Sequence, residues 1–186
     1  MIPALGLILA GGRGSRMGGA DKGFVSWRGE PLVEQVLRAL RPQVAQVAIS
    51  ANRNLARYAE LGVPVWADEA PFEGPLAGLH AGLRQLADGL DWLWLVPVDS
   101  PELPPNLGAA LMQQVGTAPA VLPRTPDGQL HPTHALVHRR LQPALASLLA
   151  EPGERGAARW LLGQGATAFD WPQDLPGFNQ PADLAR

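Results

Sequence analysis

A glycine-rich segment that ends in a lysine contains the residues of this chain most suited to chemistry. The segment runs from Leu9 to Gly23 and reads Leu-Ala-Gly-Gly-Arg-Gly-Ser-Arg-Met-Gly-Gly-Ala-Asp-Lys-Gly. Lys22 is the only lysine in the sequence, so the other 14 of the 15 basic residues are arginines. Glycines allow successive backbone N–H groups to wrap an anion, and a lysine ammonium adds a compact positive charge beside them. The segment therefore indicates a loop that binds phosphate groups.

Two common phosphate-binding loops do not fit this segment. A Walker loop needs Ser or Thr directly after Gly-Lys, but Lys22 is preceded by aspartate and followed by glycine. A dinucleotide fingerprint needs a third glycine where this chain has Met17. It also needs an acidic residue after the second strand, where residues 50–52 read Ser-Ala-Asn. An NAD-dependent enzyme is therefore not expected.

Two aspartates directly follow apolar runs that are expected to be buried strands. Asp99 follows the run 92–98, and Asp68 follows the run 63–67. A carboxylate at a strand end is a suitable ligand for Mg²⁺, which prefers carboxylate and phosphate oxygens. The alternative is that each aspartate only caps a turn. Asp99, which precedes Ser-Pro, carries the stronger metal-ligand signal.

Three further motifs leave two interpretations open. The turn before Gly78, Gly-Pro-Leu-Ala-Gly, either presents a helix N-terminus to a polar ligand or only connects two elements. The sequence His131-Pro-Thr-His134 contains two histidines without the spacing of a helical metal-ligand pair, so a substrate-side or structural role is favoured over a metal site. Asn179 either contacts phosphate or metal-bound water, or caps a terminal helix that has Pro181 in its first turn.

The elements that must position these residues alternate between strands and helices. The predicted strands cover residues 4–10, 44–51, 63–67, 92–98, 118–122, 133–137 and 167–171, and the predicted helices cover 31–40, 55–61, 76–86, 107–115, 141–149 and 157–162. This alternation predicts an α/β sandwich with a mostly parallel sheet. Ligands of such sheets bind beyond the carboxyl ends of the strands. The glycine-rich loop, Ser50, Asp68 and Asp99 each follow a different strand, so we expect them to face one crevice.

Composition excludes several classes of protein. The 186 residues are 46% hydrophobic, which predicts a globular chain, and residues 1–186 are expected to form one domain. The net charge is −2 without any block of like charge, so nucleic-acid binding is not expected. Cysteine is absent, which excludes disulfides, thiolate zinc sites and cysteine nucleophiles. No signal peptide or membrane span is recognised, so a cytoplasmic protein is expected.

A phosphate-binding loop, a lysine and a magnesium-binding aspartate together indicate a nucleoside triphosphate as ligand. Lys22, Arg16 and Mg²⁺ on Asp99 would neutralise the triphosphate. A phosphate oxygen of a second substrate could then attack the α-phosphorus and expel pyrophosphate. Such a nucleotidyl transfer depends mainly on positioning and charge stabilisation, and it needs no covalent intermediate.

These motifs, in this order, resemble those of the molybdenum cofactor guanylyltransferase (MobA) family. The resemblance spans nearly the whole chain and rests on residues 9–23, 74–78, 98–101, 131–133 and 178–184. It implies a three-layer, Rossmann-like fold of the nucleotide-diphospho-sugar-transferase type. It also implies that GTP is the nucleotide, that Mg²⁺ is required, and that molybdenum bound to molybdopterin is the acceptor. The product would be a guanine dinucleotide form of that cofactor.

The resemblance also assigns roles to single residues. Leu9, Ala10 and Gly11 would hold the guanine nucleotide through their backbone. Lys22 and Asp68 would lie in the same site, and Asp99 would bind both nucleotide and Mg²⁺. The remaining expected binding residues are Gly12, Ser50, Gly78 and Asn179.

Two positions depart from the family pattern. Relatives often have Asn where this chain has Ser50, which shortens or removes a nucleotide contact. Relatives also tend to carry a first Asn where this chain has Gly177, which bears on acceptor binding.

A cytidylyltransferase acting on the same cofactor is the near alternative, which the Gly18-Gly19 pair disfavours. A non-catalytic carrier of GTP or cofactor is the alternative from another class. Molybdoenzymes or their chaperones are the expected transient partners.

Overall fold

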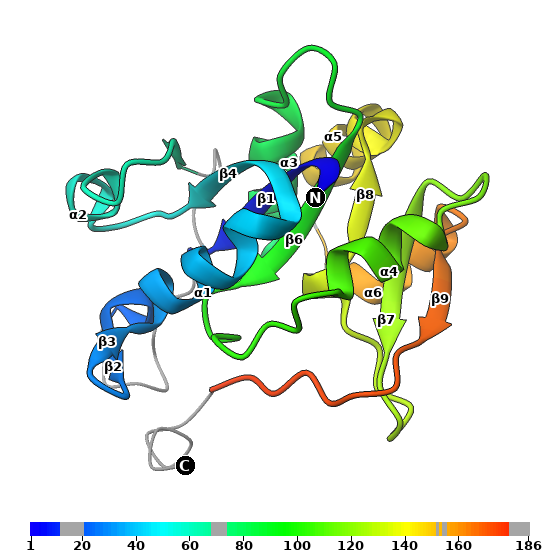
Figure 1. The fold of residues 1–186 in the computed structure, drawn as a ribbon. Coiled ribbons are helices and arrows are strands. Elements are labelled where there is room, and N and C mark those ends of the chain that lie inside the picture. Colours follow the sequence, from blue (N-terminus) through cyan, green and yellow to red (C-terminus); the bar gives the residue numbers. More distant parts are fainter. Residues whose placement is uncertain (12–20, 68–73, 152, 154–155, 179–186) are drawn as a thin grey trace.

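A seven-stranded sheet runs through the middle of the molecule, with helices on both of its faces (Figure 1). The computed structural model describes residues 1–11, 21–67, 74–151, 153 and 156–178. The strands of the sheet are β1 (Ile2–Leu9), β4 (Val44–Ser50), β5 (Val65–Trp66), β6 (Trp92–Pro97), β7 (Ala120–Arg124), β8 (Leu136–His138) and β9 (Thr167–Asp170). Their order across the sheet is β5-β4-β1-β6-β8-β7-β9.

Six of these seven strands point in the same direction. Strands β5, β4, β1 and β6 are parallel neighbours, and β7 is parallel to β9. Only β8 runs the other way, because it is antiparallel to both β6 and β7. The carboxyl ends of the other six strands therefore lie along one edge, which confirms the mostly parallel sheet predicted from the sequence.

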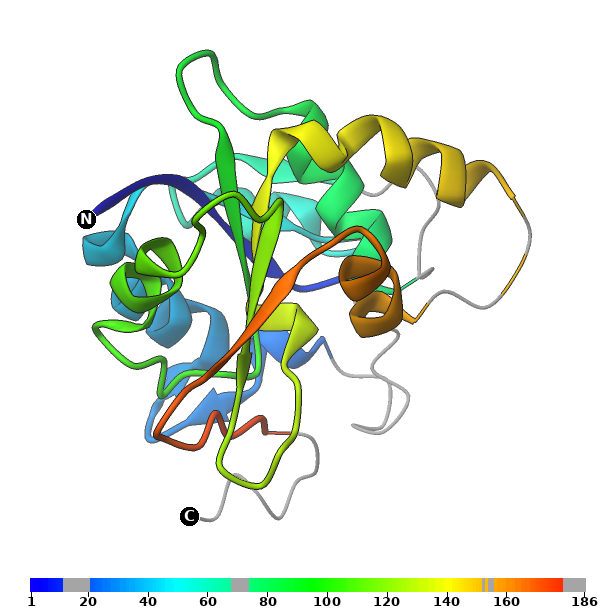
Figure 2. The same ribbon diagram turned by 90° about the vertical axis from the view of Figure 1, so that its right-hand side faces the viewer.

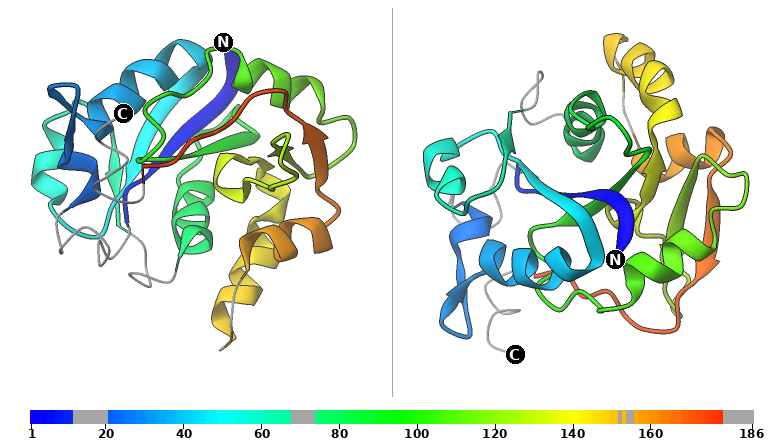
Figure 3. Two further views of the ribbon diagram at one scale, coloured as in Figure 1. Left: turned by 90° about the horizontal axis from the view of Figure 1, so that it is seen from below. Right: turned by 45° about the horizontal axis from the view of Figure 1, so that its top comes forward.

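The helices form the two outer layers of a three-layer sandwich (Figures 1 and 2). Helices α1 (Leu32–Leu40) and α4 (Leu107–Gln113) cover one face, and α3 (Pro75–Arg84), α5 (Gln142–Ala150) and α6 (Ala157–Gly163) cover the other. The short helix α2 (Leu55–Ala59) lies beyond the β4–β5 end of the sheet. Figure 3 shows the same layers from two further directions.

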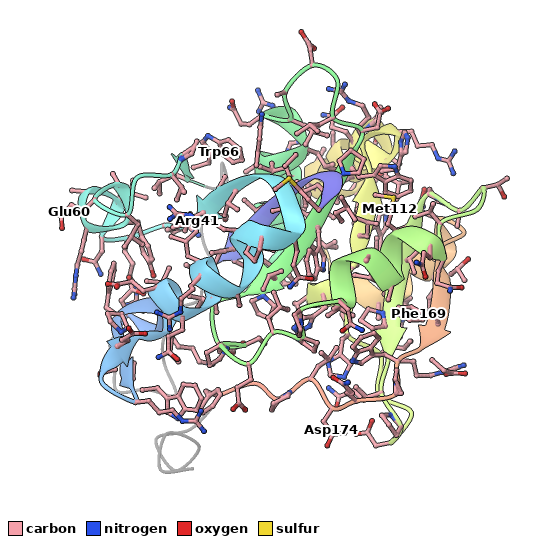
Figure 4. All side chains as sticks on the ribbon, viewed as in Figure 1. Arg41, Glu60, Trp66, Met112, Phe169 and Asp174 are labelled. Carbon is pink, nitrogen blue, oxygen red and sulfur yellow. The ribbon has the colours of Figure 1, made fainter. Side chains whose placement is uncertain are left out.

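The sequence of strand β1 is apolar without interruption because helices cover both faces of the sheet at this strand. Ala4 and Ile8 face the layer of α1 and α4, whereas Leu5 and Leu7 face the layer of α3 and α5. Successive side chains of a strand point to opposite faces, so a strand covered on both sides needs apolar residues at every position. Side chains fill both spaces between sheet and helices, while Glu60 and Asp174 reach into solvent (Figure 4).

Short elements connect the strands and helices of the sandwich. A two-stranded hairpin, β2 (Ser26–Trp27) and β3 (Glu30–Pro31), precedes α1. Its turn has positive φ angles at Arg28 (51°) and Gly29 (86°), as tight hairpin turns require. The 3₁₀ turns are η2 (Lys22–Phe24), η3 (Arg41–Gln43), η4 (Pro132–His134) and η5 (Arg139–Leu141). Among the described helices, none combines the length and apolar character that crossing a membrane requires.

The strand predicted over residues 133–137 is present, but its predicted start is wrong. Residues Pro132–His134 form the 3₁₀ turn η4, and strand β8 covers only Leu136–His138. Pro132 has no N–H to donate to a neighbouring strand, and the His134 N–H donates instead to the His131 carbonyl, 3.0 Å away. The apolar residues of the run still pack in the core, so the pattern located the burial but misjudged where the strand begins.

Candidate active site

The carboxyl ends of β4, β1 and β6 form one rigid edge. The Ala10 N–H donates to the Ser50 carbonyl over 2.8 Å, and the Val98 N–H donates to the Leu9 carbonyl over 3.1 Å. Backbone pairing therefore continues one residue past each strand. The four polar groups predicted to share an edge follow adjacent parallel strands, as the sequence indicated, although Asp68 itself lies outside the described residues.

Lys22 and Asp99 meet at this edge. The Lys22 Nζ lies 2.5 Å from Asp99 Oδ2, although the two residues are 77 positions apart in sequence. Their side chains are 20% and 19% exposed, respectively. An ion pair that still reaches solvent can exchange one partner for a charged ligand, because solvent offsets the cost of separating the charges. The structure thus brings together the two residues on which the sequence argument depended most.

The backbone of Asp99 is held by the end of the described chain. The Phe178 N–H donates to the Asp99 carbonyl over 2.9 Å. Phe178 is buried and packs against Trp27 in a tilted arrangement, with ring centroids 4.8 Å apart. The segment 171–178 connects this contact to β9 by running along the carboxyl edge of the sheet (Figure 1). Asp99 is therefore fixed from the hairpin side as well as from β6.

Helix α3 begins directly against the ends of β1 and β4. A Cβ atom on Gly78 would lie 2.7 Å from the Leu9 Cδ2 and 2.9 Å from the Ser50 Oγ. Both distances are shorter than real Cβ contacts, so a side chain at position 78 would force Leu9 and Ser50 to move. The structure therefore brings Leu9, Ser50 and Gly78 together. Ser50 is buried here, so its short side chain also serves the packing of α3 on the sheet.

Several predicted site residues lie outside the described residues, so their roles stay predictions. These residues are Gly12, Arg16, Asp68 and Asn179. Conversely, the sequence assigned no role to Asp21 or Phe178, although both belong to motifs of the resemblance, and it did not single out Tyr58, whose hydroxyl donates to Asp21. Tyr58 lies outside every motif, and its contact with Asp21 joins parts of the chain that are 37 residues apart.

The histidine motif is built into the protein interior. Neither ring nitrogen of His134 has a hydrogen-bond partner among the residues that the structure describes, and complete burial lowers the pKa of His134 to about 3. His131 is partly exposed, and its Nε2 lies 2.9 Å from the Thr125 Oγ1. Burial also lowers the pKa of His131. His134 is therefore neutral near pH 7, and the arrangement favours the structural interpretation of this motif.

The donor set near Asp99 fits a magnesium ion that is shared with a ligand. Among the residues that the structure describes, no three His, Asp or Glu side chains gather closely enough to hold a metal alone. Mg²⁺ is commonly held by one or two carboxylates together with substrate phosphates and water. A single accessible carboxylate beside a lysine suits that arrangement, whereas it would not suit a tightly bound structural metal.

Comparisons with known proteins agree with this geometry. The model of the MobA-like NTP transferase domain family matches residues 6–167. The chain is 49% identical over 163 residues to a molybdenum cofactor guanylyltransferase of Serratia proteamaculans, covering 87% of this chain and 80% of the relative. It is 43% identical over 183 residues to the enzyme of the same name from Mannheimia succiniciproducens, covering 96% and 95%.

A solved structure shares the fold at lower identity. The crystal structure of molybdopterin-guanine dinucleotide biosynthesis protein A from Archaeoglobus fulgidus superposes with a TM-score of 0.76 at 19% identity. The match covers 97% of this chain and 95% of that one. The family model and the two close relatives together span the glycine-rich segment, Lys22 and Asp99. The chain therefore belongs to the molybdenum cofactor guanylyltransferase (MobA) family.

Proposed function

We propose that this protein transfers GMP from GTP to molybdopterin-bound molybdenum cofactor, releasing pyrophosphate and forming the guanine dinucleotide form of the cofactor. The relatives from Serratia and Mannheimia carry the name of this activity at 49% and 43% identity. The observation in the chain itself that carries the proposal is the contact between Lys22 and Asp99 at the carboxyl edge. We place the reaction in the cytoplasm, with residues 1–186 acting as one catalytic domain.

In this mechanism Lys22 exchanges its carboxylate partner for phosphate oxygens of GTP. The ammonium then neutralises negative charge on the triphosphate, which favours attack by the acceptor phosphate at the α-phosphorus. Asp99 is released by the same exchange and can hold Mg²⁺, which supplies further charge neutralisation when it is bound. Arg16 is proposed to add a second cation from the glycine-rich loop.

The backbone at the end of β1 orients the nucleotide. The Ala10 N–H and the Leu9 carbonyl are already paired with β4 and β6. We therefore assign nucleotide contacts to the next groups along, the Ala10 carbonyl and the Gly11 N–H. Gly78 allows α3 to approach this point, so the N-terminal turn of α3 lies beside the proposed nucleotide. Gly12, Ser50, Asp68 and Asn179 complete the proposed binding set.

The test supplies purified protein with Mg²⁺ and molybdopterin cofactor, and adds GTP or CTP separately. We expect pyrophosphate release with GTP, and none when the cofactor is omitted. Release with CTP alone would overturn the guanine assignment. Nucleotide binding without release from either nucleotide would overturn group transfer and favour a carrier. The variant Asp99→Asn serves as the matched inactive control, because it keeps the size of the side chain. Molybdoenzymes or their chaperones are the proposed recipients of the product.

A further inference from the structure

Asp21, the residue before Lys22, is the centre of a partly buried hydrogen-bond cluster. Its side chain is only 6% exposed. The Asp21 Oδ1 accepts hydrogen bonds from the Tyr58 hydroxyl at 2.7 Å and from the Gly23 N–H at 3.2 Å. The Asp21 Oδ2 accepts one from the Asn54 Nδ2 at 2.9 Å, and the Arg53 Nε lies 3.9 Å away. A buried carboxylate with this many donors is held in one orientation.

This cluster sets the turn that carries Lys22. Asp21 is the N-cap of η2, and its bond to the Gly23 N–H closes the turn around Lys22. The two adjacent charges then face different partners: the Asp21 carboxylate bonds Tyr58 and Asn54, while the Lys22 ammonium bonds Asp99. Without such an anchor, a lysine on a glycine-rich loop would have many accessible positions.

Tyr58 fits this turn closely. A Cβ atom on Gly23 would lie 2.2 Å from the Tyr58 hydroxyl oxygen, so the hydroxyl occupies the space that a side chain would need. Tyr58 is fully buried. Its pKa is raised well above the ordinary tyrosine value, first by burial and then by the Asp21 carboxylate. The hydroxyl therefore remains a hydrogen-bond donor at every pH at which the protein would be assayed.

The segment that carries Asn54 and Tyr58 also contacts the glycine-rich segment near its beginning, at Gly11. Asn52 donates from its Nδ2 to the Gly11 carbonyl over 3.4 Å. Residues 52–58, which follow β4 and include most of α2, therefore contact two positions of the glycine-rich segment, Gly11 and Asp21. Asn54 adopts a positive φ of 52° at the start of α2, a backbone conformation that asparagine tolerates better than most residues.

We propose that Asp21, anchored by Tyr58 and Asn54, is a positioning residue that directs the Lys22 ammonium toward the reacting phosphates. This inference rests on the proposed nucleotidyl transfer. It assigns to α2 a role in the reaction, although no residue of α2 is proposed to touch the nucleotide. It also explains why aspartate and glycine flank the lysine: the first accepts the anchoring bonds, and the second leaves room for the tyrosine hydroxyl.

The single lysine makes a direct test available. Protein labelled with ¹⁵N-lysine should give one side-chain ammonium signal, which reports the surroundings of Lys22 without any substrate. We expect Tyr58→Phe and Asp21→Asn each to shift or broaden this signal. The control is Thr125→Val, which removes a buried hydroxyl from a separate cluster with Asp127 and His131 and should leave the signal unchanged. A wild-type signal in both anchor variants would overturn the proposal.

A double-mutant cycle separates positioning from general structural damage. We expect Asp21→Asn to weaken GTP binding about tenfold in the wild-type background and less than about twofold in a Lys22→Met background. Tyr58→Phe, the milder change, should show the same pattern with a smaller loss. Equal losses in both backgrounds would refute action through Lys22. Absence of guanylyl transfer by the wild-type protein would instead refute the proposed function, while the lysine signal would still decide whether Asp21 positions Lys22.

Discussion

Replacing Lys22 by arginine keeps the positive charge and changes only its shape and reach. The ammonium is held 2.5 Å from Asp99 Oδ2, on a turn fixed at the preceding residue by Asp21. A planar guanidinium on a longer side chain cannot place its charge at the same point from that backbone. Loss of one well-placed donor to transition-state charge typically lowers kcat by about 10²–10³-fold. We therefore expect Lys22→Arg to lower kcat about 100-fold, or about 2.7 kcal/mol.

The assay is steady-state pyrophosphate release as a function of GTP concentration at saturating molybdopterin cofactor. The matched control is Arg38→Lys, the reverse exchange at an exposed ion pair with Glu30 on the outside of α1, which should leave kcat within about twofold of wild type. Circular dichroism and the thermal midpoint show that each variant is folded. If Lys22→Arg retained kcat within about threefold of wild type, positive charge alone would suffice at this position and the shape of the lysine side chain would not matter.

Two further predictions concern packing and pH. Gly78→Ala should reduce the free energy of unfolding by about 1–2 kcal/mol, because overpacking against Leu9 and Ser50 exceeds the gain in helix propensity. Urea titration measures this loss. The control variant Gly163→Ala, whose Cβ meets no atom within 4 Å, should not be destabilised. Burial lowers the pKa of His134 from 6.5 to about 3, so the unfolded chain binds more protons below pH 6.5 and stability falls as pH drops. The loss of unfolding free energy from this residue should be about 2 kcal/mol at pH 5. In urea titrations, His134→Leu should therefore show a correspondingly smaller difference in unfolding free energy between pH 7 and pH 5. An unchanged difference would contradict His134 as the origin of this pH dependence.

Hydrophobic patterns predicted the layers of the fold because burial on two faces leaves a strong signal. Strand β1 is the clearest case, since its uninterrupted apolar run matches helices packed on both sides. The hairpin β2–β3 was not predicted, because strands of two residues carry no recognisable period. Its Arg28-Gly29 turn is also a weaker signal than Asn-Gly or Asp-Gly. The predicted helix from Pro31 begins one residue later, with Pro31 in β3.

The general rule for strand ends predicted that Lys22 and Asp99 lie at one edge of the sheet, but it did not describe how these residues are held there. That rule placed Lys22 and Asp99 at one edge, and the two residues are in contact. The link between Asp21 and Tyr58 spans 37 residues and has no periodic pattern, so no local reading of the sequence could find it. The burial of Ser50 likewise depends on the close approach of α3 at Gly78.

The contact between Phe178 and Asp99 has a practical consequence for handling the protein. A tag or surface linker added after residue 186 would be joined only eight residues from the backbone group that holds the Asp99 carbonyl. Met1, which is 84% exposed, precedes the opposite end of β1, roughly 23 Å from the carboxyl edge at 3.3 Å per residue. Immobilisation through the amino terminus should therefore leave the site open.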